Sequence, residues 1–219
     1  MRKGSFELTL DRFDAGMEEF LSILDQVFDA PATDWSRQKK REIHEAFIFK
    51  IASLWEVMVE DLLIDCLNRD SAQYAEFMGL RLRRHLPRQE CQALIEGLGF
   101  FDFKSVEHLK TITNDILVPL WNPFVAIPQK DGRRVNEFVA FRNYLAHYST
   151  PALRRVSSIY GRYKLSKFVE PGAFLMARPQ GASQTRYGDY FDSYSDAIRA
   201  MRKALRSALR RSQKRARAK

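Results

Sequence analysis

The feature that most constrains the fold is a long run of apolar residues at helical spacing between Ser36 and Leu67. An α-helix brings positions three and four residues apart onto one face. The apolar residues that follow these steps are Ile43, Phe47, Ile51, Leu54, Trp55, Met58, Leu62 and Cys66. The pattern predicts one long helix with a continuous buried stripe.

Three further stretches repeat the same spacing, so we expect helices there as well. The first covers residues 6–28. The second begins near Gly132 and should stop at Pro151, because proline lacks the amide hydrogen that continues a helix. The last begins near Tyr190 or Ser193. Shorter helices are expected after Pro87, ending near Gly97 or Gly99, and over residues 111–117.

Two segments lack helical periodicity. Residues 121–128 contain two prolines and should form a loop. Residues 159–184 carry scattered glycines and prolines, and we interpret them as an irregular excursion with a short hairpin around residues 168–177. No alternating strand pattern occurs elsewhere. The sequence therefore predicts an all-α helical bundle with one irregular insertion and a basic C-terminal helix.

The net charge of +9 is concentrated at the C-terminal end. Residues 199–219 hold ten basic and no acidic side chains, which leaves 26 basic against 27 acidic residues in the rest of the chain. We therefore expect a nearly neutral single domain over 1–198 and a basic extension over 199–219. This extension could bind RNA, bind an acidic antitoxin protein, or form a solvated helix face. Its candidate RNA-binding residues are Arg199, Arg202, Lys203, Arg206, Arg210 and Arg211.

Several classes of protein are disfavoured by composition. Only two cysteines, Cys66 and Cys91, are present, without metal-ligand spacing, so a disulfide framework is not expected. No signal-peptide core and no apolar run of about 18 residues occurs. We expect a cytoplasmic protein without a membrane span. His44–Ile48 lacks the second histidine of a zinc-protease motif, and no phosphate-binding glycine loop is found, so neither a metal nor a cofactor is expected.

The string FRNYLAHYS, residues 141–149, places polar residues in an otherwise apolar helix. Arg142 falls on the stripe that contains Val135, Phe138 and Leu145. An arginine there must reach solvent or a carboxylate, because an unpaired buried charge costs several kcal/mol. Glu137, or a glutamate of the helix over 36–67, could be the partner. In the structural interpretation, such a pair satisfies Arg142 and His147 is a helix cap.

The imidazole of His147 allows a second, catalytic interpretation. Asn143 lies four residues before it and could orient the ring. Arg142 and His147 are five residues apart and project about 140° apart around the axis. One straight helix therefore does not aim both at one small group, whereas two copies facing each other across a two-fold axis could.

The motif R-N-Y-L-A-H, Arg142 to His147, resembles the R-N-x-x-x-H motif of HEPN domains, which are small all-helical domains of prokaryotic toxins and defence systems. The stretch SLWEVMVEDLL, residues 53–63, is similar to the long early helix of that group, and N-P-F, residues 122–124, also resembles it. The resemblance covers residues 43–150.

This resemblance implies metal-independent cleavage of RNA by a homodimer. His147 would take the proton of the RNA 2′-hydroxyl, Arg142 would stabilise charge on the phosphate, and Asn143 would orient His147 or donate to phosphate. The product would carry a 2′,3′-cyclic phosphate. Glu56, Glu60 and Tyr148 are expected to support the site. A catalytically silent HEPN-like module that binds nucleic acid or a partner protein remains the alternative.

Overall fold

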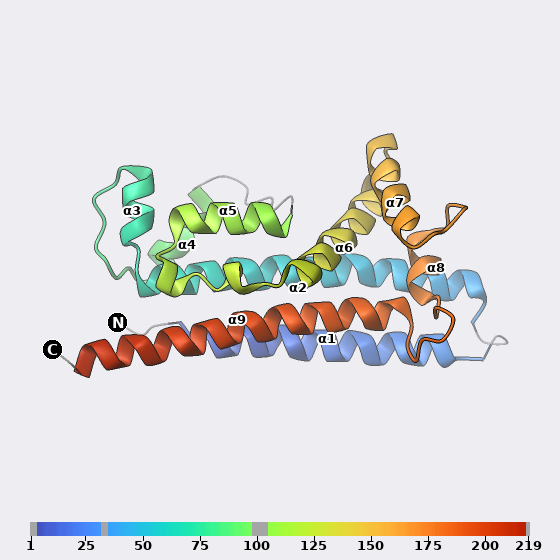
Figure 1. Cartoon of the computed structure of the whole chain (residues 1–219), viewed down its shortest axis with the longest axis horizontal. Coiled ribbons are helices and arrows are strands. Elements are labelled where there is room, and N and C mark those ends of the chain that lie inside the picture. The colour runs from blue at the N-terminus through green and yellow to red at the C-terminus, as the bar shows by residue number, and fades with distance from the viewer. Residues whose placement is uncertain (1–3, 32–34, 98–104, 218–219) are drawn as a thin grey trace.

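The computed structural model describes residues 4–31, 35–97 and 105–217, and all regular elements in these ranges are helical. Three long helices form the body: α1 (Phe6–Asp29), α2 (Arg37–Arg69) and α9 (Arg186–Arg217). They lie side by side along the longest axis of the molecule, with α1 antiparallel to both α2 and α9 (Figure 1). The predicted all-α bundle is thus confirmed.

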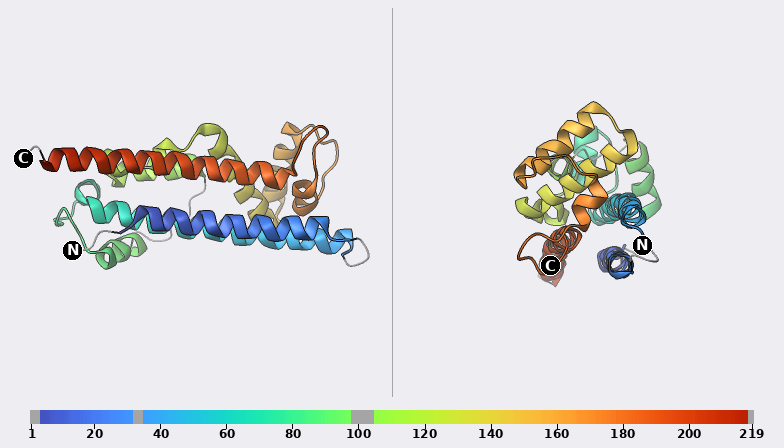
Figure 2. Two further views of the ribbon diagram at one scale, coloured as in Figure 1. Left: turned by 90° about the horizontal axis from the view of Figure 1, so that it is seen from below. Right: turned by 90° about the vertical axis from the view of Figure 1, so that its right-hand side faces the viewer.

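The shorter helices lie in two groups, one toward each end of α2 (Figure 1). At one end lie α3 (Ala72–Met78), α4 (Arg88–Gly97) and α5 (Val106–Ile116). Two 3₁₀ turns, η1 (Pro119–Trp121) and η2 (Phe124–Ala126), then run beside α9. The inclined helix α6 (Gln129–His147) leads to α7 (Thr150–Arg162) and α8 (Pro171–Met176) at the other end, as the views in Figure 2 also show.

The helix ends follow from local sequence signals. Serine side chains accept hydrogen bonds from first-turn amides at the start of α1, α2, α5 and α7. At the end of α1, the Lys40 Nζ atom donates to the carbonyl oxygens of Phe28 and Ala30, at 2.7 and 2.5 Å. These contacts satisfy carbonyl groups that lack partners within the helix and hold the end of α1 against the first turn of α2.

An aromatic cluster joins α6 and α9 to the long helices. The Phe138 ring centroid lies within 6.0 Å of the ring centroids of Tyr187, Tyr190 and Tyr194. Trp55 and Phe13 contact the Tyr194 ring from α2 and α1. Each such side chain stabilises the fold by roughly 1.5–3 kcal/mol through burial. The aromatic residues that lead into the basic extension are therefore core residues.

Several predicted boundaries need correction. No hairpin forms at residues 168–177; Pro171 instead starts α8, which buries Phe174 and Leu175. A Cβ atom on Gly172 would lie 2.5 Å from the Arg41 carbonyl oxygen, so α8 approaches α2 more closely than a larger residue allows. Pro151 does not stop α6 but lies in the first turn of α7. The last helix begins at Arg186, earlier than predicted, and Gly99 lies outside the described residues.

Two further findings concern possible ligands and membranes. Within the described ranges, no three His, Cys, Asp or Glu side chains gather so that they could hold a metal ion. No described helix combines the length and the apolar character needed to cross a membrane.

Candidate functional site

The polar residues at the C-terminal end of α6 lie at a corner of the chain, where α6 ends and α7 begins. Helix α6 ends at His147, because Tyr148 adopts the left-handed conformation with φ of 45°. A residue with a Cβ atom pays roughly 1–2 kcal/mol for this conformation. Ser149 then caps α7 by accepting a hydrogen bond from the Ala152 amide. The polar residues therefore lie where two helices meet.

Arg142 is held between α6 and α2. Its Nη2 atom donates to the Glu56 Oε1 atom at 2.6 Å, and its Nη1 atom donates to the Asn143 Oδ1 atom at 2.9 Å. The Arg142 side chain remains 30% exposed and that of Glu56 49% exposed. A charge pair of this exposure contributes about 0–1 kcal/mol to stability. The contact thus fixes the direction of the guanidinium more than it stabilises the fold.

His147 lies on the solvent-facing side of α6. Its side chain is exposed, and no hydrogen bond from its ring to another described residue is found. The Asn143 Oδ1 atom contacts Arg142 rather than His147, which differs from the expected orientation of the imidazole by Asn143. The structure therefore brings Arg142, Asn143 and Glu56 together and leaves His147 beside them on the exposed side of the helix.

The other two expected supporting residues differ in their surroundings. Glu60 is exposed one turn after Glu56 on α2, and among the described residues it forms no ion pair or hydrogen bond with Arg142. Tyr148 is 66% exposed, and its ring packs against Tyr144 with a centroid distance of 5.3 Å. Of the two glutamates expected to support the site, only Glu56 forms an ion pair with Arg142 among the described residues.

Glu137, the other candidate partner of Arg142, belongs to a buried cluster. Its carboxylate accepts hydrogen bonds from Arg162 and Tyr190, each at 2.6 Å, and from Arg134 and Tyr163, each at 3.3 Å. Burial, and then the Glu137 carboxylate, raises the pKa of Tyr190 far above its usual 10.0, so its hydroxyl remains a donor. The cluster ties α6 to α7 and α9 and fixes the corner at His147.

This cluster was not identified from sequence. Its members come from three helices and share no spacing motif. The available signal was the charged residue Glu137 between the apolar residues Val135 and Phe138, because a carboxylate in such a position needs several donors.

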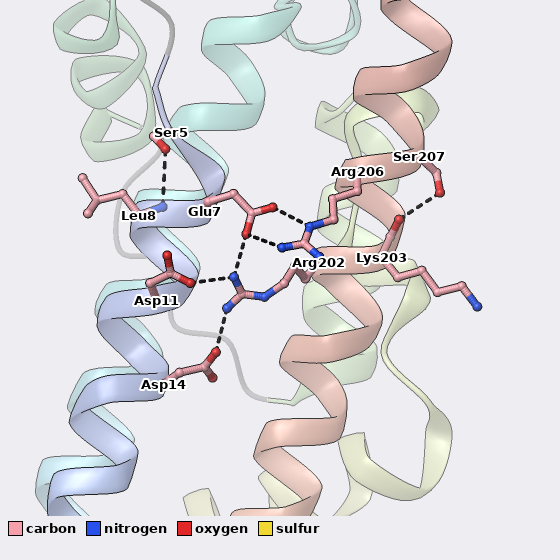
Figure 3. A network of polar contacts seen from close by, with 9 residues as sticks. All are labelled: Ser5, Glu7, Leu8, Asp11, Asp14, Arg202, Lys203, Arg206 and Ser207. Carbon is pink, nitrogen blue, oxygen red and sulfur yellow. Dashed lines mark hydrogen bonds and ion pairs between the residues drawn. The ribbon is translucent and has the colours of Figure 1, made fainter.

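The six basic residues proposed for the C-terminal extension occupy different environments on α9. The Arg202 guanidinium lies 2.6 Å from carboxylate oxygens of Glu7, Asp11 and Asp14 on α1. Arg206 also binds Glu7, with an Nε to oxygen distance of 2.8 Å (Figure 3). Arg199 pairs with Asp196 on α9 itself at 2.6 Å. The remaining three, Lys203, Arg210 and Arg211, are exposed.

We define the α1–α9 seam as Glu7, Asp11, Asp14, Arg202 and Arg206. Burial and ion pairing in this seam shift the pKa values of several of its side chains. The hydrogen bond from Arg206 lowers the pKa of Glu7, against the opposing effect of burial. Burial raises the pKa of Asp14 even though Arg202 lies beside it. Burial disfavours the charge of Arg202, but hydrogen bonds to Asp11 and Glu7 outweigh this effect and raise its pKa.

Comparisons with family models, with curated proteins and with solved structures find no match to this chain. The resemblance to HEPN domains therefore depends on the residues from Arg142 to His147 and on their sequence context.

Proposed function

We propose that this protein is a metal-independent endoribonuclease of the HEPN type that acts as a homodimer at the end of α6. One observation carries the proposal: Arg142 is oriented by Glu56 yet partly exposed, and His147 is exposed on the same helix. A cation and an imidazole in reach of solvent are the two groups that cleavage by the RNA 2′-hydroxyl requires.

The reaction follows from the chemistry of these groups. A ring nitrogen of His147 accepts the proton of the 2′-hydroxyl, whose oxygen attacks the adjacent phosphorus atom. The ordinary pKa of histidine, near 6.5, suits a base at neutral pH. The Arg142 guanidinium stabilises the charge that develops on the phosphate oxygens. The bond to the 5′-oxygen breaks, this oxygen takes up a proton from solvent, and a 2′,3′-cyclic phosphate remains.

A second copy of the chain would complete the site. Arg142 points toward α2, while the helical positions of Arg142 and His147 differ by about 140°, so the two groups of one chain diverge. Exposed apolar side chains occur on the elements that carry or adjoin the polar residues, and a second copy would cover them: Phe49 and Val57 on α2, Tyr148, and Leu153 on α7. A two-fold contact over this face would bring Arg142 of one copy toward His147 of the other.

The biological role that fits this activity is that of a toxin or phage-defence effector, with an antitoxin protein as its regulator. Such a role predicts that production of the wild-type protein slows the growth of a host cell, while the His147→Ala protein does not.

One observation favours the alternative of a catalytically silent binding module. The Arg142 guanidinium already has a carboxylate partner, and the Asn143 oxygen is directed at Arg142 and away from His147. In such a module the same face would bind nucleic acid or protein without cleavage.

Incubation of the purified protein with end-labelled RNA in excess EDTA distinguishes the two. We expect fragments that end in a 2′,3′-cyclic phosphate, and at least about 100-fold slower cleavage by His147→Ala, since loss of a general base has an effect of this size. His85→Ala is the matched control, because His85 is also exposed but lies between α3 and α4. Cleavage that needs a metal ion, or that is equal in the His147→Ala protein, would contradict the proposal.

A further inference from the structure

The cations of α9 are sorted onto two sides of the helix. Arg202 and Arg206 face α1, where the carboxylates of the α1–α9 seam neutralise them. Lys203 lies about 100° further around the axis than Arg202. In Figure 3 its side chain extends away from the seam. The positive charge of the extension is therefore available on the side of α9 that does not face α1.

That side of α9 forms one wall of a groove of about 510 Å³. The segment that contains η1 and η2 forms the opposite wall, and it runs beside α9 in Figures 1 and 2. Lys203, Ser207 and Arg211 line the groove from α9 at intervals of four residues, which corresponds to about 6 Å along the helix. The residues that line it include no carboxylate.

The hydrogen-bonding groups of the groove suit a ligand that only accepts. Lysine and arginine donate and never accept. The two other polar lining residues already use these groups within the fold. The Asn122 Nδ2 atom donates to Asn114 at 3.0 Å and its Oδ1 atom accepts from the Phe124 amide, while the Ser207 Oγ atom donates to the Lys203 carbonyl oxygen at 2.9 Å. Two cations, Lys203 and Arg211, about 12 Å apart along the helix, fit a polymer with one negative charge per unit.

The same side of the helix continues past the groove. Lys214 lies within about 20° of Lys203 around the axis, and Arg215 lies four residues after Arg211. Both are exposed and belong to α9, which extends to Arg217. From Lys203 to Arg215 the cations span about 18 Å. The volume of the groove is that of a small-ligand site, so it accommodates a few nucleotides of one strand rather than a duplex.

We propose that the groove between the η1–η2 segment and α9 binds the phosphodiester backbone of single-stranded RNA through Lys203 and Arg211. The choice of RNA over an acidic polypeptide rests on the proposed function, which supplies this polyanion as the substrate. None of the residues that line the groove belongs to the cluster at the end of α6. A variant can therefore lose RNA binding in the groove without losing the cleavage residues of α6, and the reverse.

The test uses a fluorescent single-stranded 2′-O-methyl oligoribonucleotide, which lacks the attacking hydroxyl and is not cleaved. Binding is measured from about 50 to about 300 mM NaCl. We expect Lys203→Gln/Arg211→Gln to bind at least about tenfold more weakly, with a salt slope smaller by about 1.4, because each lost phosphate contact on a single strand removes about 0.7. Arg12→Gln/Lys39→Gln removes two exposed cations from α1 and α2 and should bind like the wild type.

A second pair of variants adds a negative charge to α9 instead of removing positive charges. Ser207→Glu places a carboxylate between the two cations and should weaken binding, whereas Gln213→Glu, on the side of α9 where Arg202 and Arg206 lie, should have little effect. Circular dichroism checks that all variants fold.

Three results would overturn the assignment: no binding of the oligonucleotide by the wild type, an equal loss in Arg12→Gln/Lys39→Gln, or groove-dependent binding of polyglutamate with none of RNA. This test of RNA binding is independent of the test of RNA cleavage. His147→Ala should keep full affinity for the probe, so loss of cleavage with intact binding tests the site on α6 alone.

Discussion

Arg142 on α6 and Arg202 on α9 both pair with carboxylates of another helix, but they differ in the number of carboxylates and in exposure. Arg202 meets three carboxylates at 2.6 Å, and its side chain is 17% exposed. Arg142 meets one carboxylate, and its side chain is nearly twice as exposed. The first arrangement more than neutralises the cation and joins α1 to α9. The second orients the cation and leaves part of it accessible to an anion.

The difference shows how an arginine that holds helices together can be distinguished from one that is available for binding. The number of carboxylates and the exposure of the guanidinium decide between them, since a fully neutralised group has little affinity left for phosphate. Substitutions at the two positions should therefore affect different measurements.

The largest effect is expected for Arg142→Ala. Under the proposed mechanism Arg142 stabilises transition-state charge, so its loss should slow RNA cleavage about 100- to 1000-fold. The free energy of unfolding should change by less than about 1 kcal/mol, because the pair with Glu56 is exposed. Single-turnover cleavage and urea unfolding measure the two effects. A large loss of stability with unchanged cleavage would show that Arg142 is structural.

Arg202→Ala should show the reverse pattern. It leaves the carboxylates of Glu7, Asp11 and Asp14 close together without Arg202, which should lower the free energy of unfolding by about 2 kcal/mol. The control is Arg199→Ala, whose exposed pair with Asp196 should contribute less than about 0.5 kcal/mol. Equal urea midpoints for the two variants would mean that the pairs of Arg202 stabilise the fold no more than the exposed pair of Arg199.

A smaller effect is expected from Glu56→Gln. The amide keeps an oxygen for Arg142 but loses the charge, so cleavage should slow by a factor of roughly two to five, which corresponds to the contribution of an exposed pair. Glu60→Gln is the matched control one turn away on α2 and should leave the rate unchanged. A similar effect of both variants would mean that Glu56 acts through general electrostatics and does not position Arg142.

The smallest effect is expected in the acid pH dependence of stability. The folded-state pKa of Glu7 is below its usual 4.5, so the unfolded state binds more protons in that range. The contribution of Glu7 is therefore complete above about pH 4.5 and is lost as the pH falls through its lowered folded-state value. Asp14, whose pKa is raised by burial, acts in the opposite direction.

We would measure the free energy of unfolding with urea at several pH values between about pH 6 and about pH 3. This free energy should depend less on pH in Glu7→Gln than in the wild type. A steeper curve for the variant would mean that the pairs of Glu7 with Arg202 and Arg206 do not lower its pKa.

Helical periodicity predicted the elements that depend on local spacing. Six residues of the predicted stripe are buried on α2, while Ile43 and Leu54 are partly buried against the same core, and Phe138 and Leu145 are buried on α6 as predicted. The prediction of a hairpin over residues 168–177 was wrong because this segment has no repeating pattern. Its helix depends on Pro171 as a starting residue and on close packing against α2 at Gly172. Contacts of this kind leave no periodic signal in the sequence.

The sequence by itself determined that the chain is helical, that its excess charge lies at the C-terminal end, and that Arg142 interrupts an apolar stripe. Only the tertiary structure decided which carboxylate meets Arg142. Glu56, Glu60 and Glu137 were all candidates, and Glu56 lies 86 positions away along the chain. The tertiary structure also separated Arg202 and Arg206 from Lys203 and Arg211, because packing of α9 against α1 covers one side of the helix. The physical reason is that side-chain periodicity is a property of one helix, whereas the pairing of charges depends on the distance between helices.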